Sequence, residues 1–400
     1  MKGSIVWLVP FPLKGSGGHR TLFTHINNLV DRGYACHVYI GNEGNANLHD
    51  QDLRELVEQY FGSCGAVIHA GYQVQGRYDL AVATVWWTAS LVANQVDARE
   101  KVYFVQDFEP WFNPMGDNFI LAENSYGLGL IPVTIGRWLA HLMRETYGAP
   151  SRFFEFTAEQ SIYFPDSATK RENAVCFVYQ PEKPRRCPAL GGEALAFLKY
   201  HSPATKIYTF GSDEEPNFPF EFTHLGLLSL KQCNALYNRC RVGLCLSSSN
   251  PSRIPFEMMA AGLPVVDFFG ENTLYDLPDE AVLLAQRTPD SLAAALKKII
   301  DSRTLRQSMR DAGRMFMHER PSTLEYEQVA HILEAIMHGE GTPPHLPAPL
   351  YKAPAFAESL SAPPPQILPP PESVSRPGLL YWLQNNRISR AIKVLMRGYC

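Results

Sequence analysis

The sequence lacks a long hydrophobic run, an excess of positive charge and an obvious targeting segment. No stretch reaches the ~18 uninterrupted apolar residues that a membrane-spanning helix needs. The apolar run at residues 4–9 is too short for a signal peptide, and no small-residue cleavage site follows it. The formal net charge of −4 provides no overall basic field. Bulk electrostatics therefore argue against nucleic acid as a partner.

Metal-binding cysteine patterns are also absent. The eight cysteines include no CxxC pair and no histidine spacing of a zinc site. Several lie within apolar segments, so we expect buried free thiols in a reducing cytoplasm. The 400 residues are 46% hydrophobic and 19% charged, as in soluble globular proteins. This length predicts two or three domains, and the totals indicate a cytoplasmic protein of enzyme size.

The N-terminal segment follows a strand, glycine loop, helix, strand order. Residues 4–9 predict a buried strand, and Gly15, Gly17 and Gly18 follow in a loop that ends at His19. Apolar residues at helical spacing then predict a helix, and CHVYI predicts a second strand. This order opens many nucleotide- or sugar-binding α/β domains. A full GxGxxG pattern is missing, and a plain tight turn is the alternative explanation for the glycines.

Further strands are predicted at 66–70, 79–85 and 101–105, with helices such as 52–60 and 138–147 between or after them. The Asp50-Gln51-Asp52 triplet has the DxD form that holds a metal in one class of sugar transferases. Here it precedes a predicted helix instead of ending a strand, which favours helix capping.

Acidic and aromatic side chains gather directly after the predicted strand at 101–105. Asp107 and Glu109 follow it, and Trp111 stands nearby. Carboxylates can bind sugar hydroxyls and aromatic rings can cover sugar faces, so this pattern suits a carbohydrate cleft. A structural corner whose acids bind backbone amides is the alternative.

A second series of strands and helices begins near residue 174. Strands are predicted at 174–179, 206–210 and 242–246, and helices at 193–200 and 230–240. We therefore predict an α/β protein with two Rossmann-like domains. The expected domains and segments are 1–168, 169–318, a helix at 319–340 that returns toward the first domain, a linker at 341–375 and a tail at 376–400.

The segment 247–268, SSSNPSRIPFEMMAAGLPVVDF, predicts a loop, a short helix, a turn and a central strand. Pro255 suits the first helical position, and Gly262 suits a left-handed helix end. Glu257 falls in the first turn. A loop and helix start at the carboxyl end of a strand suit a phosphate, or a sugar hydroxyl bound by Glu257. Alternatively, Glu257 only complements the helix dipole.

The C-terminal part changes in composition. Ser322 and Glu325 form a predicted capping box at the start of a helix. Eleven of the 31 prolines fall in residues 342–371, which predicts an extended, poorly packing linker. The tail at 376–400 is amphipathic, with five basic and no acidic residues. It suits an anionic membrane surface or a partner, or a helix that packs back on its own protein.

Two signatures carry a resemblance to a known family. VYFVQDFEPWFNPMG with LAENSYGLGL, and PFEMMAAGLPVV, resemble segments of retaining glycosyltransferases of family 4. The likeness is to the WsaF-like branch of bacterial rhamnosyltransferases and covers roughly residues 1–340. It implies the GT-B fold, in which two Rossmann-like domains face each other across a cleft.

The resemblance also implies roles for individual residues. Glu257 would hold the ribose hydroxyls of a nucleotide, and Arg185 would bind the donor diphosphate. Asp107 and Glu109 would lie on the acceptor side, with Trp111 and the Gly15–Gly18 loop lining the cleft. Further donor-side positions are Gln180, Arg186, Gly211, Ser249, Arg253, Pro255 and Phe256. Ser249 and Gln180 stand where many family members have Glu and Arg, so Lys183, Arg185 or Arg186 would have to compensate.

The implied activity is metal-independent transfer, with retention, of a sugar such as L-rhamnose from dTDP-rhamnose. The acceptor would be a bacterial surface polysaccharide or a lipid-linked glycan, reached from the cytoplasm with the basic tail at the inner membrane. Fixed guanidinium groups and a helix start stabilise the charge that develops on a leaving diphosphate. A catalytically weak GT-B scaffold protein of an assembly complex is the alternative, and a sugar epimerase is a third possibility.

Overall fold

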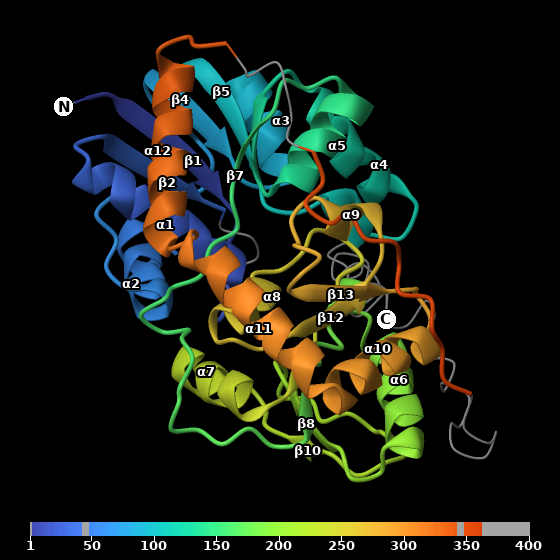
Figure 1. Cartoon of the computed structure of the whole chain (residues 1–400). Helices are drawn as coiled ribbons and strands as arrows, with labels where there is room; N and C mark the ends of the chain where they lie inside the picture. The colour runs from blue at the N-terminus through green and yellow to red at the C-terminus, as the bar shows by residue number, and fades with distance from the viewer. Residues whose placement is uncertain (1, 42–47, 342–347, 362–400) are drawn as a thin grey trace, which may run out of the picture. The chain divides into compact units, whose positions relative to one another are not determined.

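Two parallel β-sheets, each covered by helices, form the framework of the protein (Figure 1). The computed structural model describes residues 2–41, 48–341 and 348–361, and Met1–Leu360 forms one unit. The predicted tail at 376–400 lies outside the described residues. The sheets confirm the predicted α/β class with two Rossmann-like halves. We call the seven-stranded sheet with its helices the first domain, and the six-stranded sheet with its helices the second domain.

The first sheet has seven strands in the order β3-β2-β1-β4-β5-β6-β7. Their bounds are β1 (Ser4–Val9), β2 (Ala35–Ile40), β3 (Val67–Ala70), β4 (Tyr78–Ala83), β5 (Ala98–Val105), β6 (Ile131–Ile135) and β7 (Arg152–Phe154). The helices are α1 (Gly17–Asp31), α2 (Asp50–Phe61), α3 (Trp86–Gln95), α4 (Asp117–Asn124) and α5 (Arg137–Tyr147), with short 3-10 turns η1 (Glu109–Phe112) and η2 (Ser125–Gly127). β1 is apolar and buried from Ile5 to Val9, as expected for a strand that is covered on both faces.

The second sheet has six strands in the order β10-β9-β8-β11-β12-β13. They are β8 (Ala174–Val178), β9 (Lys206–Phe210), β10 (Thr223–His224), β11 (Val242–Leu244), β12 (Val265–Phe268) and β13 (Val282–Ala285). Its helical elements are η3 (Pro184–Arg186), α6 (Pro188–His201), α7 (Leu230–Arg239), α8 (Ile254–Ala260), α9 (Glu271–Leu274), α10 (Pro289–Asp301) and α11 (Arg303–His318). In both sheets the strand order reverses beside the first strand, and open α/β sheets bind ligands at such a point.

Several residues at helix ends have the positions and conformations that the sequence predicts. Gly262 has φ +69° and ends α8, while Pro255 stands in its first turn. Asp52 accepts a hydrogen bond from the His49 N–H and so caps α2, which confirms capping over metal binding for the DxD triplet. The seven described cysteines are free, and Cys187 is the one among them that is not fully buried.

Helix α12 (Ser322–Met337) packs against α1, β5 and β7 of the first sheet (Figure 1). Asn28 donates a hydrogen bond to the Tyr326 carbonyl, which fixes α12 on α1. The predicted capping box is wrong. Ser322 donates to Glu159, and Glu325 binds Arg253, because both side chains find partners distant in sequence.

The prediction of a poorly packing linker is wrong for residues 348–360. Tyr351 is buried, and its N–H donates to the Leu274 carbonyl. Phe356 pairs with Ala285, and its N–H donates to the Leu284 carbonyl. The reason is that β13 is an edge strand, whose unpaired backbone groups accept another extended segment despite its prolines.

Candidate functional site

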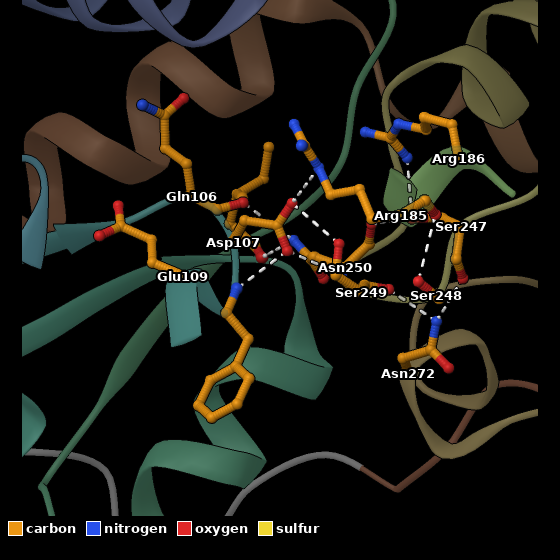
Figure 2. Close-up of polar contacts among 12 residues, drawn as sticks. Gln106, Asp107, Glu109, Arg185, Arg186, Ser247, Ser248, Ser249, Asn250 and Asn272 are labelled. Atoms are coloured by element: carbon orange, nitrogen blue, oxygen red, sulfur yellow. Dashed lines mark hydrogen bonds and ion pairs between the residues drawn. The ribbon is translucent and has the colours of Figure 1, made fainter. Parts of the chain in front are cut away.

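The candidate site lies where the loop after β5 meets the loop after β11 (Figure 2). Asn250 joins the two sheets, since its side-chain amide donates to the carbonyls of Gln106 and Ile135, each at 3.2 Å. Asn272 holds the second loop in place by donating to the carbonyls of Ser247 and Ser249 at 2.8 and 2.6 Å. The carboxyl ends of two parallel sheets therefore meet at one polar cluster.

Asp107 is the centre of this cluster (Figure 2). Its Oδ1 accepts from the N–H groups of Phe108 and Asn250, both at 2.9 Å. Its Oδ2 accepts from the Ser249 hydroxyl at 3.1 Å and lies 3.5 Å from Arg185 Nε. Asp107 therefore belongs to the first domain but binds mainly groups of the second.

Arg185 and Arg186 add two guanidinium groups to the cluster, and that of Arg185 lies beside Asp107. They lie in the short turn η3, which follows a loop after β8. The Arg185 guanidinium stands 4.2 Å from the Phe112 ring centre, and Arg186 donates to the Ser247 hydroxyl at 2.8 Å. Burial lowers the pKa of Arg185, and the charge of Asp107 partly offsets this effect.

The Nε atoms of both arginines are buried and make no hydrogen bond within the described part of the chain. Arginine remains protonated in proteins and forms paired hydrogen bonds with phosphate oxygens. Arg185 and Arg186 are therefore suited to an anionic ligand.

Glu257 lies in the first turn of α8 and is half-buried. Burial raises its pKa to about 7, and Arg253 and Tyr163 oppose that rise. The hydroxyl groups of Tyr163 and Tyr237 are buried near this carboxyl. Glu257 therefore lies in a polar, largely dry environment where it can accept hydrogen bonds from ligand hydroxyls.

Glu109 does not share the cluster with Asp107. Its carboxyl is buried within the first domain and accepts hydrogen bonds from the Trp86 N–H at 2.7 Å and the Tyr103 hydroxyl at 3.0 Å. Burial raises its pKa to about 8 despite these two contacts. The geometry fits the alternative prediction, in which this acid binds a backbone amide in a structural turn. It does not fit a catalytic carboxylate.

Arg253 and Phe256 are engaged in contacts within the protein. Arg253 forms a two-pronged pair with Glu325 at 2.7 and 2.5 Å. Phe256 is buried and stacks on Phe156 with ring centres 4.5 Å apart. Pro255 is buried as well. Ser249 is fully buried, and its hydroxyl is bound to Asp107.

The glycine loop lies next to the cluster. Gly15 has φ +76°, a conformation that favours glycine, and Ser16 caps α1 by accepting from the His19 N–H. A Cβ on Gly18 would lie 3.5 Å from the Gln106 side chain. Burial lowers the pKa of His19, whose ring contacts Ser16 and the Pro10 carbonyl. His19 is therefore mainly part of the α1 cap.

Trp111 and Gln180 lie at the borders of the site. Trp111 is 47% exposed and contacts the rings of Phe108 and Trp138. Gln180 donates to the carbonyl of Gly211, which has φ +105° and shapes the turn after β9. Sequence reasoning missed Asn250 and Asn272, whose roles depend on backbone carbonyls that they meet only in the folded chain.

Residues 173–297 match the model of the WsaF C-terminal domain family. The second domain is WsaF-like. The O-antigen biosynthesis protein RfbC of Myxococcus xanthus is 33% identical over 235 residues, which cover 57% of this chain and 18% of that relative. The chain thus matches less than a fifth of the length of this relative.

Solved structures show the same fold. Anabaena HepE in complex with UDP and glucose has a TM-score of 0.62 at 14% identity and covers 82% of this chain and 99% of HepE. Staphylococcus aureus TarM has a TM-score of 0.63 at 7% identity, covering 83% and 99%. A Rickettsia africae glycosyltransferase has a TM-score of 0.60 at 13% identity, covering 84% and 98%. These findings confirm the predicted WsaF-like resemblance and GT-B fold.

Two features are absent from the described residues. No group of three or more His, Cys, Asp or Glu side chains among them is placed to hold a metal ion. No helix within the same ranges has both the length and the apolar character needed to cross a membrane.

Proposed function

We propose that this chain is a glycosyltransferase that moves a hexose or deoxyhexose from a nucleotide sugar onto a bacterial surface polysaccharide. The observation that carries the proposal is the pair Arg185 and Arg186, whose Nε atoms are buried and make no hydrogen bond among the described residues, Arg185 Nε lying 3.5 Å from the Asp107 carboxylate. The role of RfbC in O-antigen biosynthesis and the UDP and glucose bound by HepE support the substrate class.

In this proposal the two guanidinium groups bind the donor diphosphate, and Glu257 accepts from the ribose hydroxyls. The charge on the leaving diphosphate grows as the glycosidic bond breaks, and preorganised cations stabilise it. The acceptor hydroxyl attacks on the face that the diphosphate leaves, and the departing phosphate takes its proton. Such a retaining reaction needs no strong protein base, which agrees with the buried position of Glu109.

The donor remains to be chosen by experiment, with L-rhamnose from dTDP-rhamnose as our first candidate. The full chain is incubated with dTDP-rhamnose, UDP-glucose and other nucleotide sugars, and release of the nucleoside diphosphate is measured. We expect slow hydrolysis of one donor. Arg185→Ala should reduce it about 30–1,000-fold, which corresponds to ~2–4 kcal/mol for a lost transition-state contact.

Glu257→Ala should weaken binding of the nucleotide itself. Lys206→Ala is the control, because Lys206 is an exposed cation of the same domain and pairs with Glu172. It should retain wild-type hydrolysis within about threefold. If no donor is bound or hydrolysed by the full chain, the enzyme proposal is wrong.

A second candidate function is a catalytically weak scaffold for polysaccharide assembly. Two observations favour this function. The Asp107 carboxylate lies next to Arg185 and partly neutralises its positive charge, and position 249 holds a neutral serine. A scaffold would bind nucleotide or glycan without turnover. The donor panel distinguishes the two, since only the enzyme releases nucleoside diphosphate.

We further propose that the basic tail at 376–400 holds the protein at an anionic membrane surface, where a lipid-linked acceptor would lie. Each basic residue near such a surface contributes roughly 1 kcal/mol of attraction. The full chain should sediment with vesicles that contain anionic lipid, and residues 1–361 alone should not. Sedimentation of both proteins with the vesicles, or of neither, would contradict this proposal.

A further inference from the structure

The short turn η1 of the first domain brings the ring of Phe112 to the second domain, where it contacts η3. Glu109 anchors the start of η1 through two hydrogen bonds within the first domain. The next aromatic residue, Trp111, packs on the rings of Phe108 and Trp138. Because the residues before it are fixed in this way, the half-exposed ring of Phe112 has a defined position at the domain boundary.

Arg185 approaches this ring from the second domain. Its backbone carbonyl accepts from the Ser248 N–H at 2.9 Å and from the Ser248 hydroxyl at 3.3 Å, so the loop after β11 fixes its main chain. Its guanidinium carbon stands over the Phe112 ring, 4.2 Å from the ring centre. Its Nε lies 3.5 Å from Asp107 Oδ2 (Figure 2). Two groups of the first domain therefore orient a cationic side chain of the second.

The two groups act on Arg185 in different ways. The N–H donors of a guanidinium all lie in its plane and point outward, whereas an aromatic ring attracts its face. A carboxylate therefore competes for the donors and offsets the positive charge. A ring holds the cation without using a donor and adds no charge of its own. In agreement with this, the buried Nε of Arg185 makes no hydrogen bond among the described residues.

We propose that Phe112 is a positioning residue that orients the guanidinium of Arg185 by stacking and leaves its charge and its N–H donors to the diphosphate of a nucleotide. This inference rests on the proposed function, in which Arg185 binds that diphosphate. The affinity of the second domain for a nucleotide then depends on an aromatic ring of the first. When the diphosphate replaces Asp107 at the edge of the guanidinium, the stacked face stays in place.

The test separates the aromatic face of Phe112 from its apolar volume. Binding of UDP and of dTDP to the full chain is measured by calorimetry for the wild type, Phe112→Leu and Phe112→Tyr. Leucine keeps much of the apolar volume but has no aromatic face, so Phe112→Leu should bind nucleotide about 3–30-fold more weakly. Tyrosine keeps the face, so Phe112→Tyr should stay within about threefold of the wild type.

A double-mutant cycle shows whether Phe112 acts through Arg185. In a chain that already carries Arg185→Ala, the further change Phe112→Leu should alter nucleotide affinity by less than about twofold, because the stacked cation is gone. Phe164→Leu is the control. Phe164 is 48% exposed, close to the 42% of Phe112, and it lies outside the cluster around Asp107. This control should bind nucleotide within about twofold of the wild type.

Three outcomes would overturn this inference alone, in a chain that binds nucleotide and loses affinity in Arg185→Ala. One is an unchanged nucleotide affinity in Phe112→Leu, even if donor hydrolysis falls, since the ring would then cover the sugar. Another is an equal loss in Phe112→Leu and Phe112→Tyr. The third is the full effect of Phe112→Leu in the chain without Arg185. If the wild type binds no nucleotide, or Arg185→Ala binds it equally well, the proposed function fails first.

Discussion

In this protein the surroundings of an acidic side chain, more than its residue type, determine what its carboxyl group can bind. Asp107 and Glu109 stand two positions apart after the same strand, yet one reaches the second domain and the other lies in the interior of the first. A sequence pattern of acids beside aromatic residues does not separate these two cases. The burial of each carboxyl group decides which of them can meet a ligand.

Glu109→Gln provides a test at the residue scale. Because burial raises the pKa of Glu109 to about 8, its ionisation costs the folded state stability. Below pH 4.5 the carboxyl is protonated in both states, and the cost grows as pH rises and is complete above about pH 8. The neutral amide of the variant does not ionise, so the variant should gain on the order of 1–3 kcal/mol relative to wild type at pH 9.

The measurement is the melting temperature of both proteins between pH 5 and pH 9. Glu145→Gln is the control, because Glu145 is exposed on α5 and its replacement should shift the melting temperature equally at all pH values. Glu109→Gln should also keep donor hydrolysis within about twofold. A large loss of activity with unchanged stability would show that Glu109 is catalytic after all.

At the scale of elements, helix α12 connects segments of both domains through the buried carboxyl group of Glu325. Glu325 is 3% exposed and accepts from Arg253, His25 and Thr157, which lie on or near three other elements. Although burial disfavours ionisation, Arg253 and His25 hold the pKa of Glu325 well below its usual range. The carboxylate therefore stays charged and links α8 of the second domain with α1 of the first.

Glu325→Ala should destabilise the protein by about 3–5 kcal/mol, because it leaves the partly buried Arg253 guanidinium and the buried His25 ring without their partner. Chemical denaturation at pH 7 measures this loss. Glu327→Ala is the matched control on the same helix, since Glu327 is 55% exposed and pairs with Arg32. The control should change stability by less than about 1 kcal/mol. Equal effects of the two substitutions would contradict the role assigned to Glu325.

At the scale of the whole molecule, the segment at 348–360 is part of the second domain although its composition predicts a linker. Its removal exposes the edge of β13 and the site of the buried Tyr351 ring. The chain 1–361 should melt at the wild-type temperature. The chain 1–347 should lose about 3–5 kcal/mol, the usual effect of removing a large buried aromatic side chain.

Differential scanning calorimetry of the two truncated chains provides the comparison. Both contain the proposed site residues, so a loss in 1–347 reports on the docked segment. The chain that is less stable should also bind nucleotide more weakly. An equally stable 1–347 chain would show that the contact with β13 contributes little.

The sequence by itself determined the α/β class, the order of most elements and the family signature. These depend on local features, such as the apolar run of β1, Pro255 at the start of α8 and Gly262 at its end, which act within a few residues. The placement of Glu257 in the first turn of α8 was predicted for the same reason, and its contact with a ligand stays a prediction.

Only the tertiary structure decided which polar side chains are free and which are paired. Arg253 was predicted to bind the donor but pairs with Glu325, 72 residues later, and His25 meets Glu325 across 300 residues. Asp107 reaches Ser249 across 142 residues. Burial and pairing depend on what folding brings together from distant parts of the chain, and local periodicity contains no information about such contacts.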